Sequence, residues 1–231
     1  GVWKTTNAGT TWANVTDNAN IYSASEIAIA PSDTSTIWIG TGEEDSRNSM
    51  SPGAGVFKSS DGGRTWRFMG LRATNQIGRI VIHPSDPNIV YVAALGRVWG
   101  PNPERGVYKT TDGGQTWMLV KFVSPRAGAV DIAMDPRDPN HLIASFWERI
   151  RGPYFLNSGG PGSGLWQTSD AGATWTPVTN GLPATTLGRA GLAWSPSNGA
   201  IVYTIVEADS VPNPESVRAA RVRGFVPDTT K

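Results

Sequence analysis

The stretch Lys58-Ser-Ser-Asp-Gly-Gly-Arg-Thr-Trp66 decides the fold, because the chain carries it four times. The other copies are Lys4-Thr-Thr-Asn-Ala-Gly-Thr-Thr-Trp12, Lys109-Thr-Thr-Asp-Gly-Gly-Gln-Thr-Trp117 and Gln167-Thr-Ser-Asp-Ala-Gly-Ala-Thr-Trp175. All four fit the pattern [Ser/Thr]-x-Asp-x-Gly-x-Thr-Trp, with Asn7 replacing the aspartate once. A near-constant period of this size indicates supersecondary units that bury their apolar faces only by stacking on their neighbours.

Each copy predicts a β-hairpin. Short β-rich runs flank it, for example Gly55-Val-Phe-Lys58 and Thr65-Trp-Arg-Phe68, and a Gly-containing turn between such runs is typical of a hairpin. The aspartate can accept hydrogen bonds from backbone amides, the glycine can adopt a positive φ, and the indole has a large area to bury. We therefore assign structural roles to Asn7, Asp61, Asp112, Asp170, Trp12, Trp66, Trp117 and Trp175.

A second repeated unit lies between these hairpins and aligns on a proline. Residues 26–39, 79–92, 131–144 and 191–203 each have an apolar run, a Pro-x-Asp or Pro-x-Asn turn and a second apolar run. The runs predict strands A and B, buried on both faces, and each hairpin adds strands C and D. The repeat is therefore a four-stranded antiparallel sheet, and radial repetition of such sheets gives an all-β propeller.

Counting the repeat units leaves one half of a blade at each end of the chain. Residues 21–69, 75–121 and 126–178 are complete units, whereas residues 1–15 supply only strands C and D and residues 187–207 only strands A and B. These halves could complete one blade and close a four-bladed ring over residues 1–207. They could equally belong to a larger ring, including one of eight blades made from two chains. The tail, residues 208–231, departs from the repeat.

Composition excludes several functional classes. A formal charge of +1 without a dense Lys/Arg cluster gives no support for nucleic-acid binding, and no apolar run is long enough for a membrane span. The chain has no cysteine, and His83 and His141 lie on predicted turns without further metal ligands. Asp33, Asp86, Asp135 and Asp138 are expected to form turns rather than a calcium site. We expect no metal and no cofactor.

The repeats resemble the Asp-box, or bacterial neuraminidase repeat, propellers over residues 1–207. Gly40-Thr-Gly-Glu43, Ala93-Ala-Leu-Gly96 and Gly100-Pro-Asn-Pro-Glu-Arg-Gly106 further resemble bacterial sortilin-type proteins described as repeat-containing glycosyl hydrolases. The resemblance implies a secreted or periplasmic protein and a ring of more than four blades. It does not fix an activity, because the repeat occurs in sialidases, xyloglucanases and peptide-binding sortilins.

Long B-to-C loops are the expected ligand side of the propeller, opposite the Asp boxes. They carry charges beside aromatic rings, a combination suited to sugar or peptide recognition. Pairing of these charges with one another is the alternative explanation. The candidate ligand-binding residues in these loops are Glu43, Glu44, Asp45, Arg47, Arg97, Trp99, Glu148, Arg149, Arg151 and Tyr154.

The innermost strands give a second set of candidates. Five residues before the turn prolines stand Glu26, Arg79, Asp131 and Gly191, with Arg189 two residues earlier on the same strand face as Gly191. Acid and base would alternate around the channel mouth. The charges either neutralise one another or meet a ligand. In the second case Glu26 and Asp131 would be a catalytic carboxylate pair, and Arg79 and Arg189 would bind an anionic group.

Two functions follow as hypotheses. The first is a scaffold that binds a glycan or a peptide on the long-loop face. The second is a hydrolase, most plausibly acting on glycosides, that uses carboxylates at the channel mouth. In either case a homodimer could complete a larger propeller.

Overall fold

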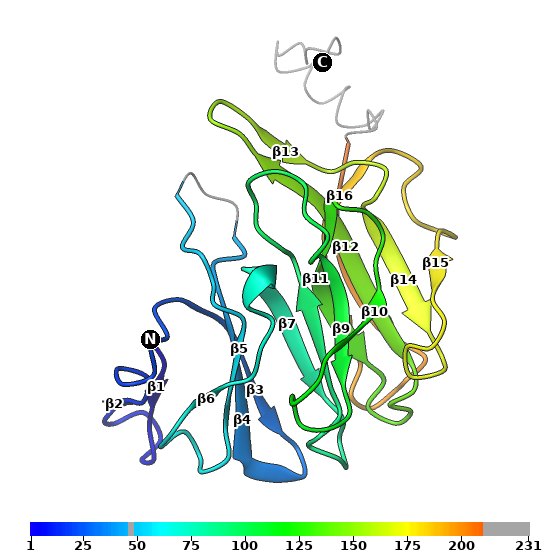
Figure 1. Ribbon diagram of the computed structural model, residues 1–231. Coiled ribbons are helices and arrows are strands. Elements are labelled where there is room, and N and C mark those ends of the chain that lie inside the picture. The colour runs from blue at the N-terminus through cyan, green and yellow to red at the C-terminus, as the bar shows by residue number, and fades with distance from the viewer. Residues whose placement is uncertain (46–48, 210–231) are drawn as a thin grey trace, which may run out of the picture.

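A computed structural model describes residues 1–45 and 49–209, and it is built from antiparallel strands with one short 3₁₀ helix (Figure 1). The elements are β1 (Trp3–Lys4), β2 (Ala13–Asn14), β3 (Ala24–Ala30), β4 (Asp33–Thr41), β5 (Val56–Ser59), β6 (Arg67–Phe68), η1 (Arg72–Thr74), β7 (Ile77–Ile82), β8 (Val90–Ala94), β9 (Gly106–Thr110), β10 (Met118–Lys121), β11 (Ala127–Met134), β12 (Leu142–Arg151), β13 (Leu156–Ser158), β14 (Gly164–Thr168), β15 (Thr176–Val178), β16 (Leu187–Trp194) and β17 (Val202–Ala208).

Three sheets have the predicted A-B-C-D order. They are β3-β4-β5-β6, β7-β8-β9-β10 and β11-β12-β14-β15, which we call sheets 1, 2 and 3. Their strands fall within residues 21–69, 75–121 and 126–178. The third sheet also carries β13, which pairs with the extended end of β12 inside a segment expected to be only a loop.

The sheets stand side by side along an arc, with their A strands on its inner side (Figure 1). Hydrogen bonds join these inner strands from one sheet to the next. The Ser25 hydroxyl on β3 donates to the carbonyl of Ile77 on β7, at 2.7 Å. The long B-to-C loops gather at the top of Figure 1 and the short turns at the bottom. The predicted division of loops between two faces is therefore seen in the structure.

Aromatic residues fill the space between sheets. Trp38 of sheet 1 is fully buried and meets Trp117 of sheet 2 edge to face, with ring centroids 5.9 Å apart. The Trp117 indole also donates to the carbonyl of Met69, at 2.7 Å. Trp66 makes the equivalent bond to the carbonyl of Val15, at 2.8 Å. Each box tryptophan of sheets 1 and 2 thus anchors its blade to the blade before it.

The repeated turns have the predicted geometry. The Asp112 carboxylate accepts hydrogen bonds from the Thr110 hydroxyl (2.7 Å) and from the hydroxyl (2.6 Å) and amide (3.0 Å) of Thr116. Gly114 has a φ of 93°. Asn7 reproduces the turn with its amide, because its oxygen accepts from the Thr11 amide while its nitrogen donates to the Thr11 hydroxyl.

Two expectations need revision. Closure of the ring by the terminal hairpins is not confirmed, because β1-β2 and β16-β17 form separate two-stranded sheets among the described residues. They lie at opposite ends of the arc, with three complete sheets between them (Figure 1). Burial on both faces holds for β8 but not for β3, where Ile27 and Ile29 remain about half exposed. These isoleucines line the central cavity and therefore lack a packed sheet opposite them.

Candidate functional site at the channel mouth

Three inner strands bring together the alternating charges predicted from the proline alignment. Arg79 on β7 lies between Glu26 on β3 and Asp131 on β11. Its Nε is 2.9 Å from Asp131 Oδ1 and its Nη1 is 3.4 Å from Glu26 Oε1. The guanidinium therefore bridges three blades.

Asp131 is the more constrained of the two carboxylates. Besides Arg79, it accepts the amides of Ile132 (2.9 Å) and Leu192 (2.8 Å), and only 7% of the residue is exposed. Glu26 accepts hydrogen bonds from the Arg79 side chain and from the Ile80 backbone, and burial raises the pKa of its carboxyl despite them. Glu26 is thus the carboxylate of the pair with more freedom to meet a ligand.

Arg189, on β16, takes a different partner from the one its position suggested. Its guanidinium contacts Glu44 Oε1 and Asp45 Oδ1, each at 3.1 Å. Glu44 and Asp45 belong to the long loop after β4, so this loop crosses the arc to reach the last inner strand. We call Glu26, Glu44, Asp45, Arg79, Asp131 and Arg189 the mouth cluster.

Arg149, on β12, holds that loop in place. It is fully buried and donates to the carbonyl of Glu44 and, at 2.7 Å, to that of Asp45. Its guanidinium lies over the Trp147 ring, 4.9 Å from the centroid. Burial lowers the pKa of Arg149 to about 10, and the group remains charged at neutral pH. Arg149 was predicted to bind ligand, but its burial gives it a positioning role.

Glu44 has the most perturbed carboxyl of the mouth cluster. Burial raises its pKa to about 7, because the loss of hydration outweighs the opposing effect of Arg189. Its Oε1 contacts Arg189, whereas its Oε2 is buried without a hydrogen-bond partner. A carboxyl in this state can carry a proton near neutral pH and donate it, which is the requirement for a general acid.

A cleft of about 310 Å³ opens beside this carboxyl. It is lined by Glu43, Glu44 and Asp45 and by Tyr22, a residue that is 88% exposed. An exposed ring beside carboxylates can stack on the apolar face of a sugar. The sequence analysis missed Tyr22, because it precedes the first inner strand and belongs to neither the box nor the proline unit.

The central cavity continues below the mouth. It has a volume of about 650 Å³ and is lined by all four inner strands. Glu26 and Arg79 lie at its rim, and apolar side chains such as Ile29 and Met134 line its wall. A polar reacting group would therefore meet the protein at the rim.

The remaining loop candidates do not converge on one site. Glu148 is buried and accepts hydrogen bonds from Arg126 (3.4 Å) and the Gly162 amide (3.2 Å), which indicates a structural role. Glu43 accepts from the Ser51 amide at 3.0 Å. The other candidates are Arg97, Trp99 and Tyr154, all exposed, Arg151, which ends β12, and Arg47, which lies outside the described residues.

Within residues 1–45 and 49–209, His, Cys, Asp and Glu side chains form no group of three that could hold a metal ion. In the same part of the chain no helix is long and apolar enough to cross a membrane.

Antiparallel sheets arranged along an arc around a charged channel mouth define the class: this is an all-β protein of the propeller type. The Sortilin-Vps10 family, described as sortilin, neurotensin receptor 3, matches residues 54–226. The chain belongs to this family.

Solved structures share the fold. An ancestral GH74 enzyme superposes with a TM-score of 0.58 at 19% identity, covering 79% of this chain and 21% of that one. The GH74 enzyme of Niastella koreensis superposes with a TM-score of 0.55 at 24% identity, covering 76% of this chain and 24% of its own.

Curated relatives are longer than this chain. A xyloglucanase of Hypocrea jecorina (strain QM6a) is 30% identical over 149 residues, 58% of this chain and 16% of its own length. A probable oligoxyloglucan-reducing end-specific xyloglucanase of Neosartorya fischeri is 25% identical over 202 residues, 80% of this chain and 21% of its own length. The chain thus spans about a fifth or less of these relatives.

Proposed function

We propose that the mouth cluster is a glycoside hydrolase site, with a glucan-type polysaccharide as its substrate class. The observation that carries this proposal is Glu44, a carboxyl whose pKa burial raises to about 7 beside a cleft that holds an exposed tyrosine. Glycoside hydrolysis generally needs one protonated and one ionised carboxyl. The names of the xyloglucanase relatives support the substrate class.

In this proposal each residue has a role that follows from its contacts. Glu44 protonates the glycosidic oxygen as the bond to the sugar carbon breaks, and the sugar develops oxocarbenium character. Glu26 is the ionised carboxylate in this proposal, and it takes a proton from the water that adds to the sugar carbon and completes the hydrolysis. Arg79 holds Glu26 in place and is itself oriented by Asp131. Tyr22 provides the stacking surface for a neighbouring sugar.

The carboxylate pair expected from sequence, Glu26 and Asp131, remains the alternative catalytic assignment. The contacts favour Glu44 over Asp131 as the acid, because three donors already engage the Asp131 carboxylate. Such donors stabilise the ionised form, whereas an acid must hold its proton until the bond breaks. Asp131 is better suited to positioning Arg79.

A glycan- or peptide-binding scaffold is the second candidate function. The observation that favours it is the distribution of exposed aromatic residues, since Tyr22, Trp99 and Tyr154 are all on the long-loop side of the sheets and largely exposed. A scaffold would bind through these rings without turnover. The setting we propose for either function is outside the cytoplasm.

The test is turnover of xyloglucan oligosaccharides and a panel of chromogenic glycosides by the purified chain. We expect Glu44→Gln and Glu26→Gln to lower kcat by about 100-fold or more, and Asp131→Asn to lower it through Arg79. Asp17→Asn, an exposed change in the turn that follows β2, is the matched control. Turnover that survives Glu44→Gln would refute the assignment. Binding of the oligosaccharides without turnover would support the scaffold.

We also propose that the blades belong to a ring that the described residues do not complete by themselves. The two terminal hairpins stay apart in the structure although each is half of a blade. A ring closed by pairing these two hairpins would have four blades, and one completed by a second copy would have eight. A larger ring, of which these blades are only a part, is the third alternative.

A further inference from the structure

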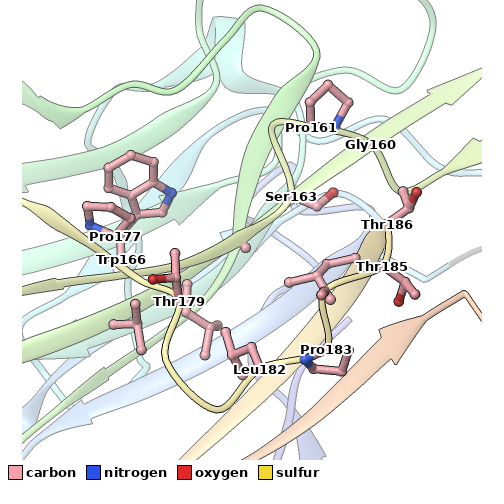
Figure 2. A pocket seen from close by; sticks show the side chains of 15 residues that line it. Gly160, Pro161, Ser163, Trp166, Pro177, Thr179, Leu182, Pro183, Thr185 and Thr186 are labelled. Atoms are coloured by element: carbon pink, nitrogen blue, oxygen red, sulfur yellow. The ribbon is translucent and has the colours of Figure 1, made fainter. Parts of the chain in front are cut away.

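A second fully buried arginine, Arg105, lies directly before β9 at the end of the long loop after β8. Counted back from the first residue of each box, the corresponding residues of sheets 1 and 3 are Ala54 and Ser163. Both are small, and Ser163 lines a groove of about 620 Å³ beside sheet 3 (Figure 2). Building a blade therefore does not require an arginine at this position, and the role of Arg105 follows from its own contacts.

The Arg105 guanidinium ties three segments together through their backbone carbonyls. Its Nη1 donates to the carbonyl of Arg126, in the connection between β10 and β11, at 2.9 Å. Its Nη2 donates to the carbonyl of Arg97 in its own loop at 2.8 Å and to that of Arg149 on β12 at 3.0 Å. Arg105 thus holds the backbone of the residue whose side chain holds the loop after β4.

These contacts form a relay of two arginines that ends at the mouth cluster. Arg105 donates to the carbonyl of Arg149, and the Arg149 side chain donates to the carbonyls of Glu44 and Asp45. Both steps are hydrogen bonds from a fully buried guanidinium. Energetic coupling between separated positions is carried by such contiguous hydrogen-bond networks. A displacement of Arg105 should therefore reach the Glu44 carboxyl in two steps.

Burial without a carboxylate partner leaves the two guanidinium groups little freedom to move. No ion pair of the described residues involves Arg105 or Arg149. Burial, followed by the positive charge of Arg149, lowers the pKa of Arg105 to about 10, so the group stays charged at neutral pH. A buried cation is costly unless its donors are satisfied. Each carbonyl acceptor is therefore needed, and together they fix the position of the Arg105 side chain.

Gly96 makes room for this arrangement. It has a φ of 77°, and a Cβ there would lie 2.5 Å from Arg105 Cγ and 2.6 Å from Asn102 Oδ1. Gly100, in the same loop, has a φ of 79°, but a Cβ there would meet nothing within 4 Å. The loop is thus built around the Arg105 side chain. Gly96 is a position from which that side chain can be displaced without replacing either arginine.

We propose that Arg105 is a second positioning residue for the mouth cluster and acts on Glu44 through Arg149. None of its hydrogen bonds reaches the mouth cluster itself, so it has no direct part in the chemistry. The proposal rests on the proposed function in one respect, since it takes Glu44 as the acid of that site. An acid must be held in place relative to the glycosidic oxygen, and small misplacements lower the rate.

The first test follows the Glu44 carboxyl by NMR titration of carbon-13-labelled glutamates, in which its signal is the one that Glu44→Gln removes. Arg105→Lys keeps the charge but loses the planar fork that reaches three carbonyls. A looser loop admits water to the carboxyl. We therefore expect the pKa of Glu44 to fall from about 7 toward 4.5, by about one pH unit or more. Amide exchange at Glu44 and Asp45 should become faster.

The matched control for this variant is Arg126→Lys. It changes a neighbouring arginine whose carbonyl, rather than its side chain, takes part in the relay. The carbonyl is retained in the variant. Both the titration of Glu44 and the amide exchange of the loop after β4 should stay as in the parent.

The second test displaces Arg105 without replacing it. Gly96→Ala and Gly100→Ala place the same methyl group at nearly the same positive φ, so they impose similar backbone strain. Only the first meets the Arg105 side chain. We expect Gly96→Ala to lower the pKa of Glu44 and Gly100→Ala to leave it unchanged. This pair of variants decides the question if Arg105→Lys does not fold.

The third test combines Arg105→Lys with Arg149→Lys. If Arg105 acts through Arg149, the double variant should shift the pKa of Glu44 no further than Arg149→Lys does alone. Shifts that add in the double variant would overturn the relay. So would a Glu44 titration and a loop exchange that remain those of the parent in both Arg105→Lys and Gly96→Ala.

Turnover separates this proposal from the proposed function. A parent chain that hydrolyses none of the glycosides would refute the glycosidase assignment, whereas the carboxyl titration and the amide exchange would still test the relay. In a chain that does turn over, Arg105→Lys should lower kcat by about tenfold or more. The basic limb of its pH profile should move to lower pH together with the pKa of Glu44.

Discussion

Glu44→Gln gives the most direct physical test of the mouth cluster. The substitution keeps the shape of the side chain and removes its titration. A pKa of about 7 in place of the ordinary 4.5 corresponds to roughly 3 kcal/mol, at about 1.36 kcal/mol per pH unit. The Glu44 side chain retains 20% exposure, so solvent screening reduces the expected effect to about 1–2 kcal/mol.

The direction in which stability changes with pH follows from proton binding to Glu44. Between pH 4.5 and about 7 the folded chain holds a proton on Glu44 that the unfolded chain has lost. The free energy of unfolding therefore falls as the pH rises through this window. The glutamine variant lacks this contribution, so relative to the parent it should gain about 1–2 kcal/mol in stability between pH 4.5 and 8.

The assay is urea unfolding of both proteins at several pH values, with the difference between their unfolding free energies plotted against pH. All other titrating groups are common to both proteins and largely cancel. Asp17→Asn, an exposed change in the turn that follows β2, provides the control plot. Parallel stability curves for Glu44→Gln and the parent would refute the conclusion that burial dominates at this carboxyl.

Three further predictions concern the framework that holds the cluster. Gly78→Ala should destabilise the chain by about 2–4 kcal/mol in thermal unfolding, because the new Cβ would lie 2.1 Å from the Val130 carbonyl of the adjacent inner strand; Gly191→Ala, which meets open space, should change stability by less than about 0.5 kcal/mol. Arg149→Lys should lower the free energy of unfolding in urea by about 2–3 kcal/mol and speed amide exchange in the loop after β4, because a lysine cannot donate to two carbonyls with a planar fork. Unchanged amide exchange would contradict the positioning role of Arg149. Threonine hydroxyl and amide donors hold the pKa of Asp170 at about 2, so Asp170→Asn should lower the melting temperature at pH 7, and the difference should shrink as the pH falls toward 2; a difference that persists at pH 2 would argue against a charge effect.

The fold could be predicted from sequence because its determinants are local. The box residues make their hydrogen bonds within one turn, as Asp112 does with Thr110 and Thr116. The proline unit specifies the adjacent strands in the same way. Even Asn7, which departs from the pattern, keeps the turn because its amide oxygen accepts from the Thr11 amide as a carboxylate would.

The site was only partly predictable, because its contacts join distant parts of the chain. The Glu26–Arg79–Asp131 series followed from aligning equivalent positions of neighbouring repeats. The burial of Glu44 had no such signal, since it depends on Arg149, about a hundred residues further along the sequence. Charged loop residues look alike in sequence whether they are buried donors or ligand contacts.

The hydrogen bonds from Arg149 to the loop after β4 also limit which changes in blade number this propeller can tolerate during evolution. Repeat proteins commonly gain or lose whole units by duplication and deletion, since each unit contacts mainly its neighbours. Here a residue of sheet 3 fixes a loop of sheet 1, so a blade inserted or deleted between them would move the arginine away from the two carbonyls it binds. We therefore expect the number and order of these three blades to be preserved. Insertion or deletion of a whole blade would be tolerated only outside sheets 1 to 3.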